Sequence, residues 1–227
     1  MVSQLMSASP TELEFGYSYL MSHNSDVTLS IDCRFGYERC VGSLSVDVTS
    51  GDFIAITGPN GSGKSTIIST IAGELEPLGG FVRVLHREGS FLVDTSSPAA
   101  AGCVSRIAEP SFFPDLTLGE HMEIIARRSG IDLDTLLDRV SPWEIVDLPN
   151  TLPNRLSSGQ RQRANLGIQL AVAPLVVVLD EPERHLDSRW TQVLCRQLRQ
   201  MTQGGTAVII ASHSSALIEA ADKEIRL

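Results

Sequence analysis

The stretch Gly58-Pro59-Asn60-Gly61-Ser62-Gly63-Lys64-Ser65-Thr66 decides the fold of this chain. It matches the pattern G-x-x-x-x-G-K-[ST], in which glycines let the backbone curl until several N–H groups point at a phosphate. The β-rich run 53–57 precedes it and a helical pattern over 65–72 follows, so the N-terminus of that helix adds its positive dipole end. A glycine-rich turn with an incidental lysine is the alternative, but it does not account for both flanking elements. The stretch therefore predicts a nucleoside triphosphate site.

Two side chains at the end of this stretch are expected to contact the nucleotide and its metal. Lys64 is placed to reach the β- and γ-phosphates with its ammonium group. The Ser65 hydroxyl is placed to hold Mg²⁺, which prefers oxygen ligands. Both expectations follow from the pattern, because these two residues occupy its last two fixed positions.

An apolar strand that ends in acidic residues forms a second pattern. Residues 175–179 are a continuous apolar run, typical of a central parallel strand buried on both faces, and Asp180-Glu181-Pro182 follows. Since ligands bind at the carboxyl ends of such strands, Asp180 is expected to hold Mg²⁺, directly or through water. Glu181 is expected to polarise the attacking water as a general base. Alone, the acidic cluster would fit a helix-capping loop equally well, but its pairing with the phosphate-binding stretch favours the catalytic interpretation.

A Ser-Ser-Gly turn before a helix forms the third pattern. Leu156-Ser157-Ser158-Gly159-Gln160 directly precedes a helical run with apolar residues from Ala164 to Ala171. Free N–H groups and small side chains at a helix N-terminus let the backbone approach a phosphate closely, so this turn is a candidate anion site. A plain N-cap by Ser157 or Ser158 is the alternative.

Together, these segments resemble the ATP-binding cassette (ABC) family, specifically the nucleotide-binding subunit of ABC transporters. The resemblance covers about residues 27–227 and rests on five motifs in the family's order. They are Walker A at 58–66, the signature motif (family form LSGGQ) at 156–160, Walker B at 175–180, the D-loop at Leu186-Asp187, and the switch histidine His213. The fold that the resemblance implies is α/β, a P-loop NTPase core of ABC type with an antiparallel β subdomain and a helical subdomain.

The resemblance also implies roles for single residues. Phe35 lies where the family places an aromatic residue that stacks on adenine, with Tyr37 as a rival. His213 occupies the position from which the family bridges γ-phosphate and Glu181, although a lone histidine at a strand end is more often structural.

ATP and Mg²⁺ are the cofactors implied. The nucleotide-binding residues are Phe35, Gly58, Pro59, Asn60, Gly61, Ser62, Gly63, Lys64, Ser65, Thr66, Ser157, Gly159 and Gln160; the catalytic residues are Glu181, His213 and Lys64; the metal ligands are Ser65 and Asp180.

Two positions depart from the family pattern. The family usually has a glutamine that senses Mg²⁺ and the attacking water a few residues before the segment 113–117, and here that position falls on Ala108. Either Glu109 substitutes or the contact is absent, and a carboxylate there would repel Glu181 and the γ-phosphate. Ser158 replaces the first glycine of the signature, with little effect expected because serine is small.

Composition bounds the class of protein. With 227 residues and 42% hydrophobic content, the chain is long enough for one compact domain with two lobes. A net charge of −9 argues against a nucleic-acid partner, which normally meets a basic face.

The four cysteines (33, 40, 103 and 195) lack metal-binding spacing, so we expect reduced, mostly buried thiols, typical of the cytosol. No apolar run reaches the roughly 18–20 residues that span a bilayer, and residues 1–25 lack the basic side chain of a secretory signal.

Domain organisation follows from the same patterns. We expect an N-terminal arm over 1–26 and an ABC ATPase domain over 27–227, with a helical subdomain at about 115–160. An antiparallel β layer is expected at roughly 27–57, after which the core resumes with strands at 81–85 and 90–93. In the helical insert, Thr117 is expected to cap a helix over 118–128 and Asp132 one over 133–140.

The function expected is MgATP hydrolysis that drives a separate transmembrane permease subunit, from a peripheral position on the cytoplasmic face of the membrane. The site would be shared by a homodimer or heterodimer, with Ser157 to Gln160 of one protomer closing over the nucleotide of the other. A non-transport ABC ATPase that acts on DNA or ribosomes is the alternative, but the segment between Lys64 and Ser157 is too short for a coiled-coil arm. A small-molecule kinase would leave the signature motif unexplained.

Overall fold

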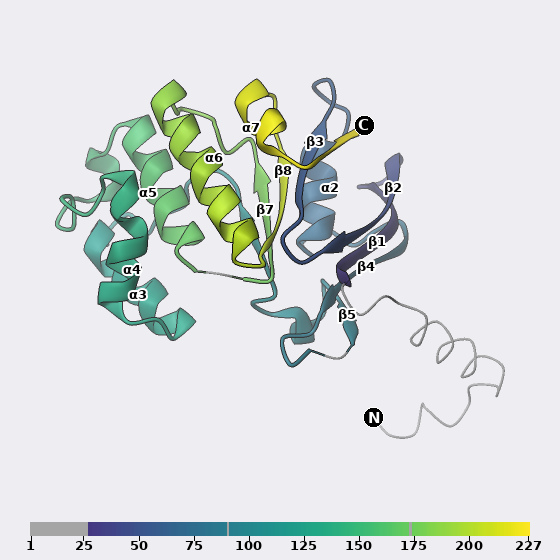
Figure 1. Cartoon of the computed structure of the whole chain (residues 1–227), viewed down its shortest axis with the longest axis horizontal. Coiled ribbons are helices and arrows are strands. Elements are labelled where there is room, and N and C mark those ends of the chain that lie inside the picture. Colours follow the sequence, from purple (N-terminus) through teal and green to yellow (C-terminus); the bar gives the residue numbers. More distant parts are fainter. Residues whose placement is uncertain (1–26, 90, 173) are drawn as a thin grey trace.

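Two β-sheets of different kinds organise the chain (Figure 1). The computed structural model describes residues 27–89, 91–172 and 174–227; the arm expected over 1–26 lies outside these residues. Among the described residues, no helix is both long and apolar enough to cross a membrane.

The central sheet is parallel and has the strand order β6-β7-β8-β3-β9. Its strands are β3 (Phe53–Thr57), β6 (Val104–Ile107), β7 (Val176–Asp180), β8 (Ala207–Ala211) and β9 (Lys223–Arg226). Strands β3 and β8 are buried along their whole length, because helices or the second sheet cover both faces. Asp180 pairs in register with Ala211, so the segments that follow β7 and β8 leave the sheet side by side.

The second sheet is antiparallel, with the order β2-β1-β4-β5. Its strands are β1 (Val27–Gly36), β2 (Cys40–Thr49), β4 (Gly79–Leu85) and β5 (Leu92–Asp94). The expected layer over 27–57 is therefore wrong at its end, because residues 53–57 form β3 of the parallel sheet. The strands expected to rejoin the core also belong to this antiparallel sheet: β4 pairs with β1 and β5 pairs with β4. β5 begins at Leu92 rather than at residue 90, which lies outside the described residues.

Opposite faces of the parallel sheet pack against different parts of the chain. Phe53 and Ala55 of β3 belong to a core that includes the helical segments, whereas Ile54 and Ile56 belong to a core shared with the antiparallel sheet. This alternation follows from the two-residue period of a strand. In Figure 1, helices α3 to α6 accordingly gather on one side of β7 and β8, with β1, β2 and β4 on the other.

Four of the six α-helices in the described residues, α3 to α6, begin at a side-chain cap. The six helices are α2 (Lys64–Ile71), α3 (Leu118–Ser129), α4 (Leu133–Val140), α5 (Ser158–Leu170), α6 (Ser188–Gln203) and α7 (Ser215–Ala220), with short 3-10 turns at Pro98–Ala100, Ser141–Trp143 and Pro153–Arg155. Thr117 forms a capping box with Glu120, and the Asp132 carboxylate accepts a hydrogen bond from the Thr135 N–H. Both predicted caps of the helical insert are confirmed.

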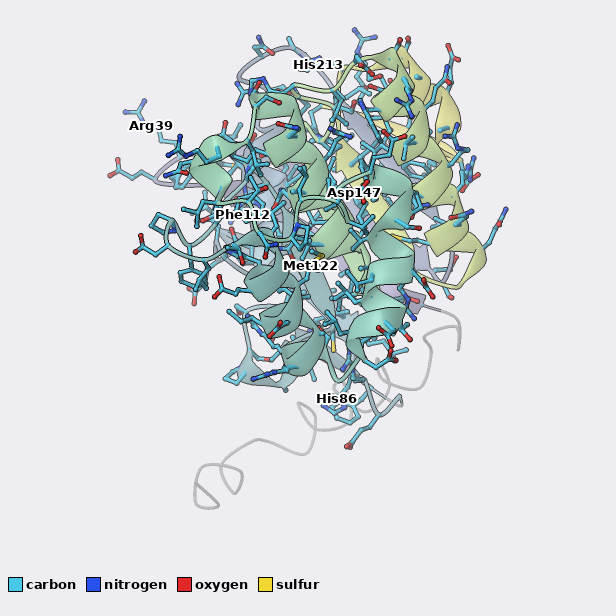
Figure 2. The ribbon with its side chains drawn as sticks, turned by 90° about the vertical axis from the view of Figure 1, so that its left-hand side faces the viewer. Arg39, His86, Phe112, Met122, Asp147 and His213 are labelled. Atoms are coloured by element: carbon cyan, nitrogen blue, oxygen red, sulfur yellow. The ribbon has the colours of Figure 1, made fainter. Side chains whose placement is uncertain are left out.

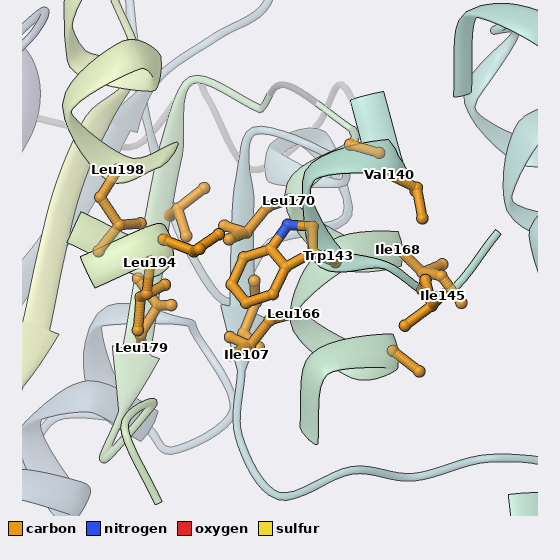
Figure 3. Packing of buried hydrophobic residues seen from close by; sticks show 14 of the residues in the cluster. Ile107, Val140, Trp143, Ile145, Leu166, Ile168, Leu170, Leu179, Leu194 and Leu198 are labelled. Atoms are coloured by element: carbon orange, nitrogen blue, oxygen red, sulfur yellow. The ribbon is translucent and has the colours of Figure 1, made fainter. Parts of the chain in front are cut away.

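Trp143 joins the helical segment to the sheet core (Figure 3). Its side chain is fully buried, and a Cβ at Gly167 of α5 would lie 2.9 Å from its Cδ1 atom. Only glycine leaves room for the indole at this point. Figure 3 shows the ring beside Leu166 and Leu170 of α5, so the helical segment packs against the core that supports β7.

The cysteines differ in environment more than expected. All four are free thiols, and Cys33 and Cys103 are buried. Cys40, however, is exposed at the start of β2, and Cys195 is partly exposed on α6. The expectation of mostly buried thiols is thus wrong for Cys40, because it is the first residue of β2, where the strand leaves the exposed turn after β1.

Candidate active site

The phosphate-binding loop turns from β3 into α2 through glycines in the left-handed region. The backbone φ is 83° at Gly61 and 96° at Gly63. A Cβ at Gly63 would lie 2.7 Å from Val41 Cγ1 and 2.9 Å from Phe35 Cε2, so no other residue fits there without a shift. The Ser62 hydroxyl is buried without a hydrogen-bond partner among the described residues. The loop thus has the shape and the spare hydrogen-bonding capacity of a phosphate cradle.

Lys64 points back into this loop. Its side chain is 7% exposed, and Nζ donates hydrogen bonds to the carbonyl oxygens of Gly58 (2.9 Å) and Pro59 (3.1 Å). These neutral acceptors hold the ammonium group at the loop, where phosphate oxygens would be stronger partners because they are charged.

Ser65 and Asp180 meet although 115 positions separate them in the sequence. Ser65 Oγ, in the first turn of α2, donates a hydrogen bond of 3.1 Å to Asp180 Oδ1 at the end of β7. A hydroxyl and a carboxylate this close fit the oxygen ligand set of Mg²⁺. Among the described residues, no group of three histidine, cysteine or acidic side chains could hold a metal by itself. A metal here would take its remaining ligands from phosphate or water.

Glu181 and His213 face each other at the same edge of the sheet. His213 Nε2 lies 4.0 Å from Glu181 Oε1, and both side chains are partly exposed. Glu181 adopts a φ of 46°, which is uncommon for a residue other than glycine, and its N–H donates to the Ala211 carbonyl at 2.9 Å. That hydrogen bond ties the turn after β7 to β8, so the carboxylate is held near the imidazole.

Glu183 holds the loop that carries His213. Its Oε1 accepts hydrogen bonds from Ser212 Oγ (2.6 Å), the His213 N–H (3.0 Å) and the Ser214 N–H (3.2 Å). Its Oε2 is buried and has no partner among the described residues. One carboxylate oxygen thereby fixes three consecutive residues of this loop.

A cavity of about 550 Å³ lies beside Ser65, Asp180 and Glu181. Ser65, Asp180 and Glu181 line it from the sheet edge, and Ser158 and Arg161 line it from α5. The cavity therefore lies between the phosphate-binding half of the chain and the helical half. Figure 2 shows His213 at the upper end of the molecule, at the opposite end of the view from His86 in the turn between β4 and β5.

The position expected to hold a glutamine contains a methyl group instead. Ala108 lines the cavity, and its carbonyl accepts a hydrogen bond of 3.1 Å from Asn165 Nδ2. Glu109 also lines the cavity, but its carboxylate forms an ion pair with Arg184. The positive charge of Arg184 therefore offsets the negative charge of Glu109, which reduces the expected repulsion of Glu181 and the γ-phosphate by Glu109.

The signature segment begins α5 in the way a plain N-cap does. Ser157 Oγ accepts from the Gln160 N–H at 3.2 Å, and Gln160 Oε1 accepts from the Ser157 N–H at 2.9 Å. Of the two candidate caps, Ser157 and Ser158, the structure thus shows Ser157 as the N-cap of α5. Ser157 and Ser158 are exposed, and Gly159 is partly exposed, so this turn is accessible from outside the chain.

The two candidate adenine-stacking residues differ sharply in exposure. Phe35 is 0% exposed and belongs to the hydrophobic core beneath the phosphate-binding loop, next to Gly42 and Gly63. Its ring therefore offers no face to a base in this conformation, contrary to the role expected for it. Tyr37, the rival, is 70% exposed in the turn between β1 and β2.

Sequence patterns missed three charged residues at this site: Arg106, Glu183 and Arg184. Arg106 carried only a weak signal: it lies two residues before Ala108, the position expected to hold a glutamine. Glu183 and Arg184 carried none, since acidic and basic residues in a loop are normally solvated.

Comparisons with known proteins agree with this geometry. A family model described as "ABC transporter" matches residues 41–184. An uncharacterised ABC transporter ATP-binding protein of Mycobacterium tuberculosis (strain ATCC 25618 / H37Rv) is 28% identical over 201 residues, which cover 83% of this chain and 59% of that protein. YdbJ of Bacillus subtilis (strain 168), an uncharacterised ABC transporter ATP-binding protein, is 32% identical over 81% of this chain and 59% of its own length. The chain thus spans 59% of the length of each of these two relatives.

Solved structures share the fold. The chain resembles an ATP-binding subunit of an ABC transporter with a TM-score of 0.77 at 23% identity, over 88% of this chain and 85% of that one. It also resembles the dimeric ATP-binding cassette MJ0796 bound to ADP and Pi, with a TM-score of 0.74 at 22% identity over 88% and 94%. The expected fold class is confirmed. Since the family model covers more than half of the sequence, the chain belongs to the ABC transporter family, as an ATP-binding cassette.

Proposed function

We propose that the chain hydrolyses MgATP and so drives a separate transmembrane subunit of an ABC transporter. The observation that carries this proposal is the meeting of Ser65, Asp180, Glu181 and His213 at one edge of the parallel sheet, with contacts of 3.1 Å and 4.0 Å. These residues come from three distant segments of the chain. Their convergence supports a site at which a hydroxyl, two carboxylates and an imidazole surround the terminal phosphate of a nucleotide on the loop.

In this proposal the loop, Lys64 and an aromatic residue bind the nucleotide. The backbone from Gly58 to Thr66 surrounds the phosphates, and Lys64 exchanges its carbonyl partners for phosphate oxygens. We assign the base to Tyr37 instead of Phe35, because only the tyrosine ring is exposed in this conformation.

Glu181 and His213 have different roles in the proposed hydrolysis. Glu181 accepts a proton from water while the water oxygen bonds to the γ-phosphorus and the bond to the β,γ-bridging oxygen breaks, which releases ADP and phosphate. His213 donates a hydrogen bond to the γ-phosphate and keeps Glu181 in place. Mg²⁺ held by Ser65 and Asp180 would neutralise charge on the phosphate oxygens.

A second cassette completes the site in this proposal. Ser157 and Gly159 of one copy face the γ-phosphate bound to the other, and Gln160 supports the turn through its capping box. The accessibility of the signature turn supports this arrangement, as does the dimeric state of the related cassette MJ0796. The partner is either an identical copy or a homologous cassette.

The membrane partner and the domain boundaries are part of the same proposal. The chain is placed on the cytoplasmic face of the membrane, bound to a permease, because its relatives are named ABC transporter ATP-binding proteins. We take residues 27–227 as the cassette and about 115–160 as the helical subdomain that contacts the permease. The helices α3 and α4, which lie within that range, support this division.

The test is reconstitution with the permease encoded by an adjacent reading frame with about six transmembrane spans. Copurified complexes in lipid vesicles should hydrolyse MgATP faster than the isolated chain, and the Glu181→Gln complex should lose that activity. Failure of the chain to copurify with the permease, together with unstimulated hydrolysis, would favour a non-transport ABC ATPase instead.

A further inference from the structure

Arg106 lies between two carboxylates at the edge of the candidate site. Its Nη1 donates a hydrogen bond of 2.6 Å to Glu74 Oε2, and its Nη2 lies 3.6 Å from Asp180 Oδ2. Its side chain is only 22% exposed, and Nε is buried without a partner among the described residues. The guanidinium therefore retains unused donors, and Arg106 lines the same cavity as Ser65 and Glu181.

The Asp180 carboxylate is consequently shared between Ser65 and Arg106. Ser65 Oγ donates to one of its oxygens at 3.1 Å, while Arg106 lies beside the other, and the Asp180 side chain is 14% exposed. A divalent cation that binds between Ser65 and Asp180 must share this carboxylate with a guanidinium of the same sign. Like charges a few ångströms apart repel, and partial burial reduces the screening of that repulsion by water.

The same guanidinium has the opposite effect on phosphate. A nucleotide on the phosphate-binding loop brings its terminal, negatively charged oxygens toward the cavity that Arg106 lines. Arginine suits this role, since its charge is permanent and its planar fork binds phosphate oxygens well. Ala108 lies two residues after Arg106, just past the end of β6, and so points to the same side of the chain. It also lines the cavity, but it presents only a methyl group there.

We propose that Arg106 is a built-in counter-charge of the metal and phosphate site. It weakens the binding of a divalent cation at Ser65 and Asp180, and it strengthens the binding of the polyphosphate of a nucleoside triphosphate. The chain thereby retains part of its nucleotide affinity without metal. This inference rests on the proposed nucleotide site and adds a residue with two opposite effects to it.

A purely structural role is the competing explanation. The pair with Glu74 ties β6 to the segment that follows α2. Glu74 is half exposed, at 50%, and ion pairs with exposed partners contribute little to stability. A structural role predicts that losing Arg106 weakens metal and nucleotide binding together, whereas a counter-charge predicts changes of opposite sign.

The experiment measures both affinities, for metal and for nucleotide, in the full-length Arg106→Gln variant. Fluorescent ATP is titrated in EDTA. In separate samples without EDTA, Mn²⁺ is titrated into the ATP-bound protein and followed by electron paramagnetic resonance. We expect the Kd for metal-free ATP to rise about 3- to 10-fold, and the Mn²⁺ concentration at half-saturation to fall by a similar factor. Arg106→Lys, which keeps the charge, should stay close to the wild type in both titrations.

Two further variants keep the outcome interpretable. Arg83→Gln breaks the exposed pair with Asp94 in the antiparallel sheet and should change neither titration. Glu74→Gln removes the competing partner of Arg106, so Mn²⁺ should bind more weakly than in the wild type. If Arg106→Gln does not fold, the expected shift in Glu74→Gln supports the proposal and an unchanged value contradicts it.

Opposite shifts in Arg106→Gln support the counter-charge. Parallel weakening, or no change in either titration, overturns it while the nucleotide site itself stands. A wild-type chain that binds no ATP, with or without metal, would overturn the proposed function as well.

Discussion

The carboxylate of Glu183 accepts a hydrogen bond from the backbone N–H of His213, with 3.0 Å between Oε1 and N. The same oxygen also accepts from Ser212 and Ser214, so His213 is held at the centre of a three-residue clamp. Hydrogen bonds to a charged acceptor are stronger than neutral ones. The clamp keeps the imidazole facing Glu181, at 4.0 Å between Nε2 and Oε1.

Loss of this clamp should slow hydrolysis without weakening nucleotide binding. For Glu183→Ala we expect kcat to fall about 10-fold and the KM for ATP to change less than about 2-fold, since a misplaced catalytic group mainly affects the chemical step. Glu183→Gln keeps one oxygen acceptor and should retain more activity. Steady-state kinetics of the three proteins measure this split.

The control for this prediction is the His213→Ala background. If Glu183 acts through His213, adding Glu183→Ala there should have little further effect on kcat. Additive losses would mean that Glu183 acts elsewhere. Glu219→Ala, a change of an exposed carboxylate on α7, should leave kcat unaltered.

Lys64→Ala should remove most of the affinity for MgATP. Lys64 is nearly buried in the phosphate-binding loop, so truncation should cost about 2–4 kcal/mol of binding free energy, as for other buried charge partners. Labelled ATP titrations measure this loss. The only other lysine of the chain, Lys223, is exposed on β9, and Lys223→Ala is the matched control. Equal affinities for both variants would refute the assignment of Lys64.

Glu181→Gln should separate nucleotide binding from hydrolysis. The amide keeps the shape of the side chain but cannot accept the proton, so turnover should fall about 100-fold or more. Because ATP then persists in the site, ATP-bound dimers should accumulate on gel filtration with MgATP. Normal turnover together with a monomeric elution volume would show that Glu181 is not the base.

Stability at high pH should depend on Cys33. Burial, with a smaller contribution from Asp32, raises the pKa of this thiol to about 11 from its ordinary value of 9.0. Because the folded-state pKa is the higher one, the contribution to stability is complete below about pH 9 and is lost as the pH rises through about 11. Urea unfolding at pH 8 and pH 10.5 should therefore show a larger loss in the wild type than in Cys33→Ala. An equal loss in both proteins would contradict the assignment.

The sequence predicted elements best where local signals decide them. The helix over 133–140 and the β-rich run over 53–57 match the bounds of α4 and β3 to the residue. Asp132 caps the helix, and a short apolar run defines the strand. Sheet membership was harder to predict. Residues 53–57, 81–85 and 90–93 all have strand propensity, but which sheet each one joins depends on pairing with distant segments.

The candidate site shows the same division. Ser65 and Asp180 were predictable, since each belongs to a motif whose spacing is fixed by chemistry. Arg106 contacts Glu74 and Asp180, which lie 32 and 74 positions away in the sequence. Glu183 contacts residues that lie 29 to 31 positions away, and no local pattern encodes any of these contacts. The burial of Phe35 depends on Gly42 and Gly63, which leave space for its ring.

The two aromatic residues near the phosphate-binding loop should respond oppositely to truncation. Tyr37 is exposed, so Tyr37→Ala should leave the free energy of unfolding nearly unchanged and weaken ATP binding by about 1–3 kcal/mol, the usual cost of losing a base–aromatic stack. Phe35 fills the core beneath Gly63, so Phe35→Ala should destabilise the fold by about 3–5 kcal/mol.

Urea unfolding and titrations with ATP and inorganic triphosphate distinguish these effects. Triphosphate has no base, so Tyr37→Ala should not alter its binding if the ring stacks on adenine. Tyr37→Phe keeps the ring and should bind ATP as the wild type does. If Tyr37→Ala binds ATP normally, whereas a folded Phe35→Leu variant loses affinity for ATP but not for triphosphate, then Phe35 rotates out of the core to meet the base and the assignment reverses.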